Sequence, residues 1–408
     1  MRKQDDKALC GPLELGPRQQ RPFPEMMGRE RFLRALREEH RSGAASRYLT
    51  DQLYPLLFRA YKKARRTGRN SYAQERFERH LPANLDRLRK ELLDGTYRPQ
   101  RCTIFIVTRP VRREVIAPAF RDQVVDHLLY EYLSPIFERF FIFDSFSCRK
   151  GKGTSAGIAR LEHHIRSVSE NYTKPAWVLQ LDLRGYFMSI DHNILYDRVA
   201  TILQKAGCQK DPFYPLAMYL TRTIVYSNPT VNFTRRGPAS DWSELPVSKS
   251  YFHCKAGTGL PIGKLTSQLF SNVALDPLDQ FAKRVLREKH YGRYVDDLFF
   301  VGQEKEHLLS LVEPVGAFLR EQLHLSLHPE KVRIQDVRKG ISFLGAVVRP
   351  DGNTLSARAG RLMAKTLEEA YCFEENTFLV ASKTASCKGH VQDKRNSRVE
   401  GLMLCRGW

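Results

Sequence analysis

Three aspartates stand where apolar stretches of the sequence end. In the stretch RYVDDLFFV, Asp296 and Asp297 are adjacent, and apolar residues lie on both sides of the pair. In WVLQLDL, Asp182 follows a similar apolar run. Adjacent carboxylates repel each other unless a bound cation neutralises them. Carboxylates that converge at strand ends are the ligands from which two-metal sites are built, with the ions ~3.5–4 Å apart.

Such a site favours Mg²⁺, because this ion binds hard oxygen ligands and leaves room for water and phosphate. We therefore predict two Mg²⁺ ions at Asp182, Asp296 and Asp297, with Mn²⁺ as a possible substitute. The alternative is that the Asp-Asp pair is an ordinary turn feature, since aspartate is common in turns. The two interpretations differ in whether the fold brings Asp182 to the pair.

The elements around the aspartates follow from the hydrophobic pattern. A strand is expected over 177–183, and a hairpin is expected with Asp296 and Asp297 at its turn. Two further strands are expected within 102–118, and a hairpin over 341–355 with Asp351-Gly352 as its turn signal. Helical periodicity predicts helices over 77–93, 120–141, 192–206, 265–289 and 306–323. The mixture predicts an α+β protein.

Composition favours a polyanionic partner. The 408 residues include 66 Lys and Arg against 45 Asp and Glu, a formal net charge of +21. Such a balance is typical of nucleic-acid binding, and a solvated basic surface is the alternative. No apolar run is long enough for a membrane span, and no signal peptide is evident, so we expect a cytoplasmic protein without a membrane partner. The scattered cysteines favour reduced thiols, with a zinc site as the alternative at Cys372, Cys387, His390 and Cys405.

Several segments occur in an order that is familiar from one family. They are LDLRGYFMSIDH, GLPIGKLTSQLFSNVALDPLDQF, RYVDDLFFV, LHPEKVRI and FLGAVV. Together they resemble the palm motifs of reverse transcriptases. Upstream, VRREVIAPAFRDQVVDHLL and DSFSCRKGKGTSAGI resemble the fingers motifs of bacterial reverse transcriptases. The resemblance implies a right-hand polymerase with fingers, an antiparallel palm sheet backed by helices, and a small or incomplete thumb.

A division into four segments follows from this resemblance and from the composition. We expect a basic, flexible arm over 1–45 and the fingers with N-terminal helices over 46–176. The palm is expected over 177–348, with an inserted loop at 226–258. A small thumb or C-terminal tail is expected over 349–408.

Within the family, GLPIG and LTSQ are most similar to reverse transcriptases of diversity-generating retroelements. Defence-associated bacterial reverse transcriptases are similar next. Group II intron and retroviral enzymes usually carry Gln where this chain has Ile262, and Lys264 stands where the most similar enzymes usually have Asn. The resemblance implies a bacterial or phage-encoded RNA-directed DNA polymerase that copies template RNA into cDNA from a primer and dNTPs, with frequent errors. A small basic accessory protein is an expected partner.

The resemblance also implies roles for individual residues. Asp182, Asp296 and Asp297 match the metal ligands and catalytic residues of the family. Phe187 matches an aromatic gate that excludes the 2′-hydroxyl of a ribonucleotide. For the incoming nucleotide, Arg113 and Arg121 are expected at the triphosphate, and Lys331 is expected as a general acid for pyrophosphate or simply as a charge near it. Gly263 is expected where the backbone approaches the templating pair closely, and Ile262 and Gln268 are expected beside the nascent pair. For primer and template, they are Arg149, Lys150, Phe343, Leu344 and Gly345.

Other functions remain open at this point. A defence reverse transcriptase that makes DNA in response to phage is the nearest alternative. An RNA-dependent RNA polymerase is disfavoured by Phe187, because such an enzyme must accept the 2′-hydroxyl, and by Val295, where glycine is more typical. A non-catalytic RNA-binding scaffold is disfavoured by the presence of all three carboxylates.

Overall fold

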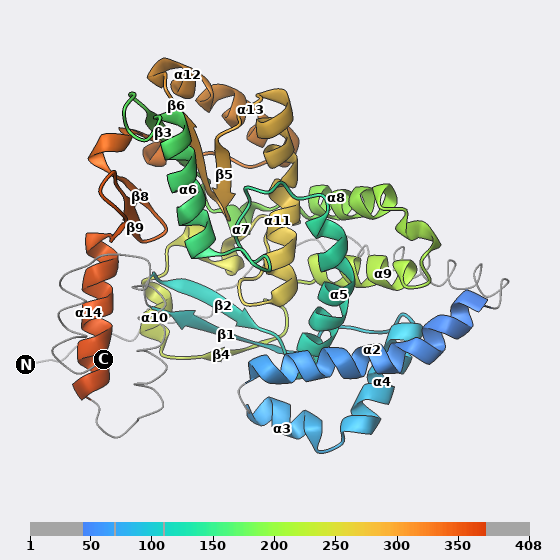
Figure 1. Cartoon of the computed structure of the whole chain (residues 1–408). Coiled ribbons are helices and arrows are strands. Elements are labelled where there is room, and N and C mark those ends of the chain that lie inside the picture. The colour runs from blue at the N-terminus through green and yellow to red at the C-terminus, as the bar shows by residue number, and fades with distance from the viewer. Residues whose placement is uncertain (1–43, 69–70, 109–110, 373–408) are drawn as a thin grey trace, which may run out of the picture.

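The computed structural model of the protein describes residues 44–68, 71–108 and 111–372. These ranges form an α+β structure in which three sheets are surrounded by helices (Figure 1). The predicted arm over 1–45 lies almost wholly outside the described residues, as does most of the predicted thumb. No helix within the described ranges is long and apolar enough to cross a membrane.

The central sheet carries the three aspartates. It has four antiparallel strands in the order β5-β6-β3-β7. The strands are β3 (Trp177–Asp182), β5 (Tyr291–Tyr294), β6 (Asp297–Gly302) and β7 (Arg333–Asp336). The predicted strand and hairpin are therefore confirmed, because the apolar runs form β3, which ends at Asp182, and β6, which begins at Asp297.

Both faces of the central sheet are buried. Successive side chains of a strand point to opposite faces, so a continuous apolar run places apolar side chains on both. Side chains of one face join the main core beneath α8 (His192–Lys205), α11 (Leu265–Gln280), α12 (Lys305–Ser310) and α13 (Val312–Leu323). Those side chains are Leu179, Leu181, Leu298 and Phe300. The other face, with Val178, Phe299 and Val301, packs against α6 (Thr154–Val168).

A second sheet lies in the fingers and has the order β2-β1-β4. Its antiparallel pair β1 (Cys102–Val107) and β2 (Arg113–Ala117) agrees with the sequence prediction. The third strand, β4 (Phe233–Arg236), pairs parallel with β1 and comes from 226–258, which was expected to be a palm loop. Within β4, Phe233 is partly buried and the other three residues are exposed, so the sequence shows no hydrophobic alternation. The strand therefore depends on its pairing with β1.

The insert also contains the short helix α10 (Ala239–Ser243) and is fastened to the fingers by a buried carboxylate. Glu114 of β2 accepts hydrogen bonds from the Tyr251 backbone N–H at 2.8 Å and from the Ser250 hydroxyl at 3.0 Å. Arg112 donates to the Asp241 carbonyl at 2.9 Å. The insert is therefore joined to the sheet of β1 and β2 and contains a strand of that sheet, where only a loop was expected.

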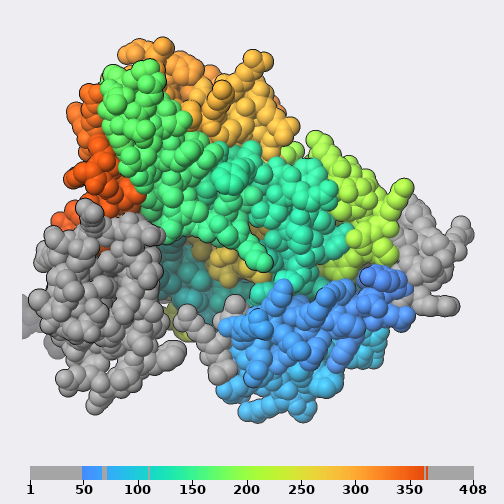
Figure 2. Space-filling model, viewed as in Figure 1, coloured from blue at the N-terminus to red at the C-terminus, as the bar shows by residue number. Residues whose placement is uncertain are grey.

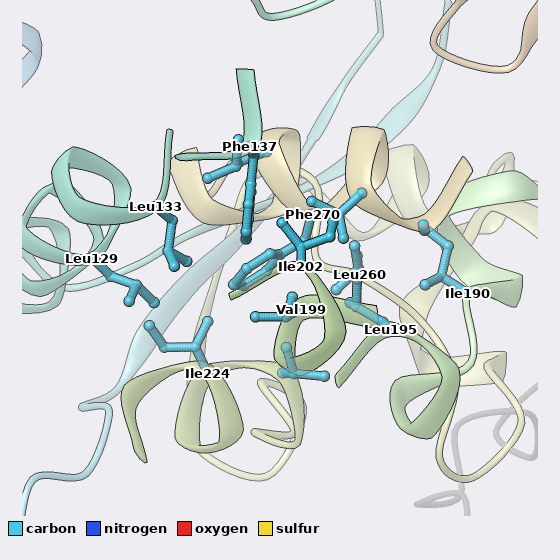
Figure 3. Packing of buried hydrophobic residues seen from close by; sticks show 14 of the residues in the cluster. Leu129, Leu133, Phe137, Ile190, Leu195, Val199, Ile202, Ile224, Leu260 and Phe270 are labelled. Carbon is cyan, nitrogen blue, oxygen red and sulfur yellow. The ribbon is translucent and has the colours of Figure 1, made fainter. Parts of the chain in front are cut away.

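Further helices pack around α5 (Phe120–Glu138). They are α2 (Ala44–Gly68), α3 (Tyr72–Glu78), α4 (Leu81–Leu93) and α9 (Tyr214–Val225). Figure 3 shows how side chains of α5, α8, α9 and α11 meet in one core, with Phe137, Val199, Ile224 and Phe270 among them. Figure 2 shows a recess between green atoms of α6 and blue atoms of α2 to α4, with yellow atoms at its floor.

A third sheet follows the palm, with the order β10-β9-β8. Its strands are β8 (Ile341–Phe343), β9 (Ala346–Val348) and β10 (Thr354–Leu355), and α14 (Ala357–Cys372) comes next. Asp351-Gly352 lies in the turn between β9 and β10, as expected. The sequence did not reveal a second turn at Leu344-Gly345, where both residues have positive φ, +49° and +82°. The alternative zinc site falls on side chains outside the described part of the chain.

Candidate active site

The fold brings the three predicted carboxylate residues to one place. Asp182 is the last residue of β3 and Asp297 is the first residue of β6, and the two are directly paired across the antiparallel ladder. Tyr294 and Asp297 close the β5-β6 hairpin, so Val295 and Asp296 form its turn. The fold therefore brings Asp182 to the Asp296-Asp297 pair, which is the condition that separates a metal site from an ordinary Asp-Asp turn.

The charges at this edge are not balanced by the protein. Burial, together with the negative charges of Asp296 and Asp182, raises the pKa of Asp297 to about 7. Burial and the neighbouring Asp182 also raise the pKa of Asp296, while Lys331 and Arg113 act in the opposite direction. A cluster of carboxylates that resists ionisation is a place where a bound cation would relieve repulsion.

Lys331 forms an ion pair with one member of the cluster. Its Nζ lies 2.9 Å from Oδ1 of Asp182. It ends the short 3₁₀ helix η5 (Pro329–Lys331), which is held to β3 by a hydrogen bond of 2.8 Å from the His328 N–H to the Asp182 carbonyl. Because the Lys331 side chain is 47 % exposed, this ion pair is weak and can be exchanged for another partner.

The carboxylates suit a magnesium site by their chemistry. Three carboxylate groups supply the hard oxygen donors that Mg²⁺ prefers. In the described residues, no group of three or more His, Cys, Asp or Glu side chains is already arranged around one metal position. Asp182, Asp296 and Asp297 therefore provide donors and unbalanced charge rather than a finished coordination shell.

Phe187 lies close to these strands, on the short helix α7 (Tyr186–Ser189) that follows β3. Its carbonyl accepts a hydrogen bond of 2.7 Å from the Leu260 N–H, and its ring makes an edge contact with Tyr186 at 5.3 Å between centroids. The side chain is half-buried against the main core. One side of the ring is thus supported by the fold and part of it is left accessible, as a gate residue requires.

Gly263 lies where the backbone closely approaches a strand of the second sheet. Its φ is +117°, and a Cβ at this position would lie 2.7 Å from the Ile116 carbonyl oxygen of β2. The neighbouring Ile262 carbonyl accepts a hydrogen bond of 2.7 Å from the Ile116 N–H. The close approach is therefore to the fingers strand, and it joins the loop before α11 to β2. Gln268 is exposed in the first turns of α11.

The two predicted triphosphate-binding arginines have different surroundings. Arg113 is exposed at the start of β2, makes no ion pair with any described residue, and is close enough to lower the pKa of Asp296. Arg121 is largely buried, and both of its terminal nitrogens contact the carboxylate of Glu91, one of them at 3.0 Å. Arg121 therefore joins α5 to α4, and its predicted role at the triphosphate is not supported.

Arg149 also has a structural position. Its side chain is 5 % exposed, pairs with Glu138 through Nε and Nη2, and donates to the carbonyls of Ile142 and Ser145 at 2.7 and 2.8 Å. All of these donors have partners within the fold, so the predicted contact of Arg149 with template phosphates is not supported. Lys150, the next residue, is exposed.

The predicted primer-grip residues divide into a buried and a projecting part. Phe343 is buried beneath the sheet, edge to face with Phe299 at 5.2 Å between centroids. Leu344 and Gly345 form the β8-β9 turn. A Cβ on Gly157 of α6 would lie 3.2 Å from Cδ1 of Leu344, so this turn touches the helix that covers the palm sheet.

One residue at the site was not identified from the sequence. Arg293 lies on β5, two residues before Val295 of the hairpin turn, and 0 % of its surface is exposed. Its ion-pair partner Asp279 is also fully buried. The only signal in the sequence was a charged residue between the apolar Tyr291 and the catalytic turn.

Comparison with known proteins agrees with the motifs. Residues 110–348 match the family model described as "Reverse transcriptase (RNA-dependent DNA polymerase)". Protein YkfC of Escherichia coli K12 is 25 % identical over 318 residues, which cover 70 % of this chain and 76 % of YkfC. The group II intron-encoded protein LtrA of Lactococcus lactis is 20 % identical over 352 residues, and the match covers 68 % of this chain and 52 % of LtrA.

Solved structures of telomerase are similar at a greater distance. The telomerase of Candida albicans in complex with a fragment of telomeric RNA has a TM-score of 0.43 and 10 % identity, over 72 % of this chain and 54 % of that chain. Apo telomerase of Candida tropicalis has a TM-score of 0.43 and 13 % identity, over 62 % of this chain and 48 % of that one. This chain thus spans about half the length of LtrA and of these telomerases.

Proposed function

The chain belongs to the reverse transcriptase (RNA-dependent DNA polymerase) family, and on this premise we propose that it copies template RNA into cDNA at Asp182, Asp296 and Asp297. Membership confirms the predicted right-hand polymerase fold and the assignment to the RNA-directed DNA polymerases. The role of each site residue, the metal and the biological context are parts of the proposal.

One observation carries the proposal. Two strands that are far apart in the sequence end side by side at Asp182 and Asp297, and the turn between β5 and β6 adds Asp296. Folding places these acids together although burial and mutual repulsion raise the pKa values of Asp296 and Asp297. Such an arrangement works against stability and is typical of a functional site.

The chemistry that we propose divides between a bound metal and the protein. Two Mg²⁺ ions, or Mn²⁺ in their place, would activate the primer 3′-hydroxyl and neutralise the triphosphate and the leaving pyrophosphate. Arg113 presents its exposed guanidinium to the triphosphate, since guanidinium groups match phosphate oxygens. Lys331, next to Asp182, donates a proton to the departing pyrophosphate. Phe187 blocks the 2′-hydroxyl of a ribonucleotide.

We further propose that copying is error-prone, as in diversity-generating retroelements. Ile262 supports this, because an isoleucine side chain beside the nascent pair cannot donate a hydrogen bond that helps selection. Its backbone is held against β2 through the Ile116 N–H, so the side chain is presented from a rigid segment. A defence reverse transcriptase is the second candidate, because the same loop sequence is similar to those enzymes.

The partners follow from the same function. Template RNA and primer are the expected polyanions for a chain with a net charge of +21. The dNTPs are the expected substrates, and a small basic accessory protein and a cytoplasmic setting remain predictions.

The deciding experiment is primer extension on an RNA template of defined sequence, with dNTPs and Mg²⁺, followed by sequencing of the product. Asp297→Asn serves as the inactive variant, since it keeps the shape of the side chain and removes its charge. Asp351→Asn, in the exposed turn between β9 and β10, is the matched control and should remain active.

Template-directed DNA with errors concentrated opposite adenine would support the diversity-generating function. Faithful DNA, or DNA unrelated to the added template, would support the defence function instead. Activity that survives in Asp297→Asn would refute the assignment of the site. A wild-type protein that makes no DNA with either Mg²⁺ or Mn²⁺ would count against catalysis and favour the scaffold.

A further inference from the structure

Arg293 carries a full charge into the interior of the palm. It belongs to β5, two residues before the catalytic turn, and 0 % of its surface is exposed. Burying a guanidinium is costly unless every donor has a partner. The way in which its donors are used therefore indicates what the residue does.

Two of the donors form a fork on Asp279 of α11. Nε lies 2.8 Å from Oδ1, and Nη2 lies 2.7 Å from Oδ2. The hydroxyl of Tyr291 donates to Oδ1 of the same carboxylate at 2.7 Å. This arrangement fixes the plane of the guanidinium, because a bidentate pair allows little rotation.

The remaining terminal nitrogen reaches the turn itself. Nη1 of Arg293 donates to the carbonyl of Val295 at 3.0 Å and approaches Oδ1 of Asn272 at 3.3 Å. The Val295 carbonyl belongs to the peptide that joins Val295 to Asp296. Val295 has a φ of +55°, a left-handed conformation that β-branched residues rarely adopt. The bond from Arg293 thus holds a strained peptide directly before the first catalytic aspartate.

The backbone of Arg293 is equally constrained. Its N–H donates to the Asp144 carbonyl at 2.8 Å, and its carbonyl accepts from the Phe146 N–H at 3.0 Å. The position from which the side chain reaches the turn is therefore set by the segment between α5 and α6. The backbone and the guanidinium group of Arg293 are therefore both held in place by hydrogen bonds.

We propose that Arg293 is a positioning residue for the polymerase reaction, oriented by Asp279, and that it holds the Val295–Asp296 peptide so that the carboxylates of Asp296 and Asp297 face the reacting groups. The inference rests on the proposed function and deepens it. Stability alone does not explain the pair, because a buried ion pair can often be replaced by apolar residues without loss of stability. A misplacement of about 1 Å at reacting atoms, in contrast, can lower a rate about 100-fold.

The first test is Arg293→Lys, which keeps the charge but cannot bind Asp279 through a fork and reach the Val295 carbonyl at the same time. We expect kcat for primer extension to fall about 100-fold, with the KM for dNTP changed by less than about twofold, because Arg113 and Phe187 lie on other elements. The Mg²⁺ concentration for half-maximal activity should rise as well.

The matched control is Arg198→Lys. Arg198 of α8 pairs with Asp276, another fully buried carboxylate on α11, but it makes no contact with the turn among the described residues. It should lower the melting temperature without changing kcat or the Mg²⁺ requirement by more than about twofold. The comparison separates loss of a buried ion pair from loss of the turn contact.

A second variant covers the case in which Arg293→Lys does not fold. Arg293→Met combined with Asp279→Asn removes both charges and keeps an acceptor for the Tyr291 hydroxyl. We expect this double variant to fold and to have the same loss of kcat. Wild-type kcat in either folded variant would overturn the inference, and so would failure of both to fold, since folding would then explain the pair. A wild-type protein without polymerase activity would instead contradict the proposed function.

Discussion

Asp297→Asn should make the metal-free protein more stable while abolishing synthesis. The pKa of Asp297 is about 7 in the folded protein, against an ordinary value of 3.8. A shift of roughly three units corresponds to at most ~4 kcal/mol, since each unit is worth about 1.4 kcal/mol. Solvent screens this partly exposed side chain, so we expect a gain of about 1 to 3 kcal/mol in the free energy of unfolding.

The sign of the pH dependence follows from the direction of the shift. Because the pKa is higher in the folded than in the unfolded protein, unfolding releases protons between about pH 4 and pH 7. The wild type therefore loses stability relative to Asp297→Asn as the pH rises through this window. The difference should be largest above about pH 7 and should disappear below about pH 4.

The assay is urea unfolding in EDTA at about pH 8 and at about pH 5, with wild type, Asp297→Asn and the exposed control Asp351→Asn. The control should stay within about 0.5 kcal/mol of wild type at both pH values. Added Mg²⁺ should stabilise the wild type and narrow its difference from Asp297→Asn, because a ligand that binds the folded state stabilises it. An Asn variant that is less stable than wild type at the higher pH would refute the electrostatic account of this site.

Four other changes test separate parts of the site. Phe187→Ala should increase ribonucleotide incorporation in a competition between rNTP and dNTP, and an unchanged ratio would remove Phe187 as the gate. Ile262→Gln should alter misincorporation opposite template adenine in sequenced products, and an identical error spectrum would end its proposed role in fidelity. Gly263→Ala should cost at least about 2 kcal/mol in urea unfolding, because alanine disfavours a φ of +117° and its Cβ would meet the Ile116 carbonyl; wild-type stability would show that the loop relaxes freely. Binding of RNA should weaken steeply with salt, as expected for a chain of net charge +21, and a flat salt profile would argue against phosphate contacts.

The palm could be predicted from the sequence because its signals are local. An apolar run that stops at Asp182 and another that starts after Asp297 already indicate two buried strands with acids at their ends. The same holds for Asp191, which directly precedes α8 and whose Oδ1 accepts hydrogen bonds from the N–H groups of Asn193 and Ile194 at 2.8 and 3.2 Å. In each case the residues that decide the structure lie within a few positions of each other.

The insert was misjudged because its structure is not local. The residues of β4 are mostly exposed and show no alternation, so the strand exists only because β1 offers an unpaired edge. Gly263 was expected beside the nascent pair, and the structure shows a close approach of its backbone to β2 that the sequence did not reveal. A glycine in the sequence can indicate a close approach to the backbone, and only the fold shows which group approaches it.

By itself, the sequence determined the family, the order of the palm motifs and the three aspartates, since these depend on residue types at short spacing. Only the tertiary structure decided which partner each of four arginines has, because folding brings together charged groups that are not neighbours in the sequence. Arg121 is bound by Glu91 and Arg149 by Glu138, so both stabilise the fingers. Arg113 is left at the surface near Asp296, and Arg293 is buried on Asp279 with one nitrogen at the catalytic turn.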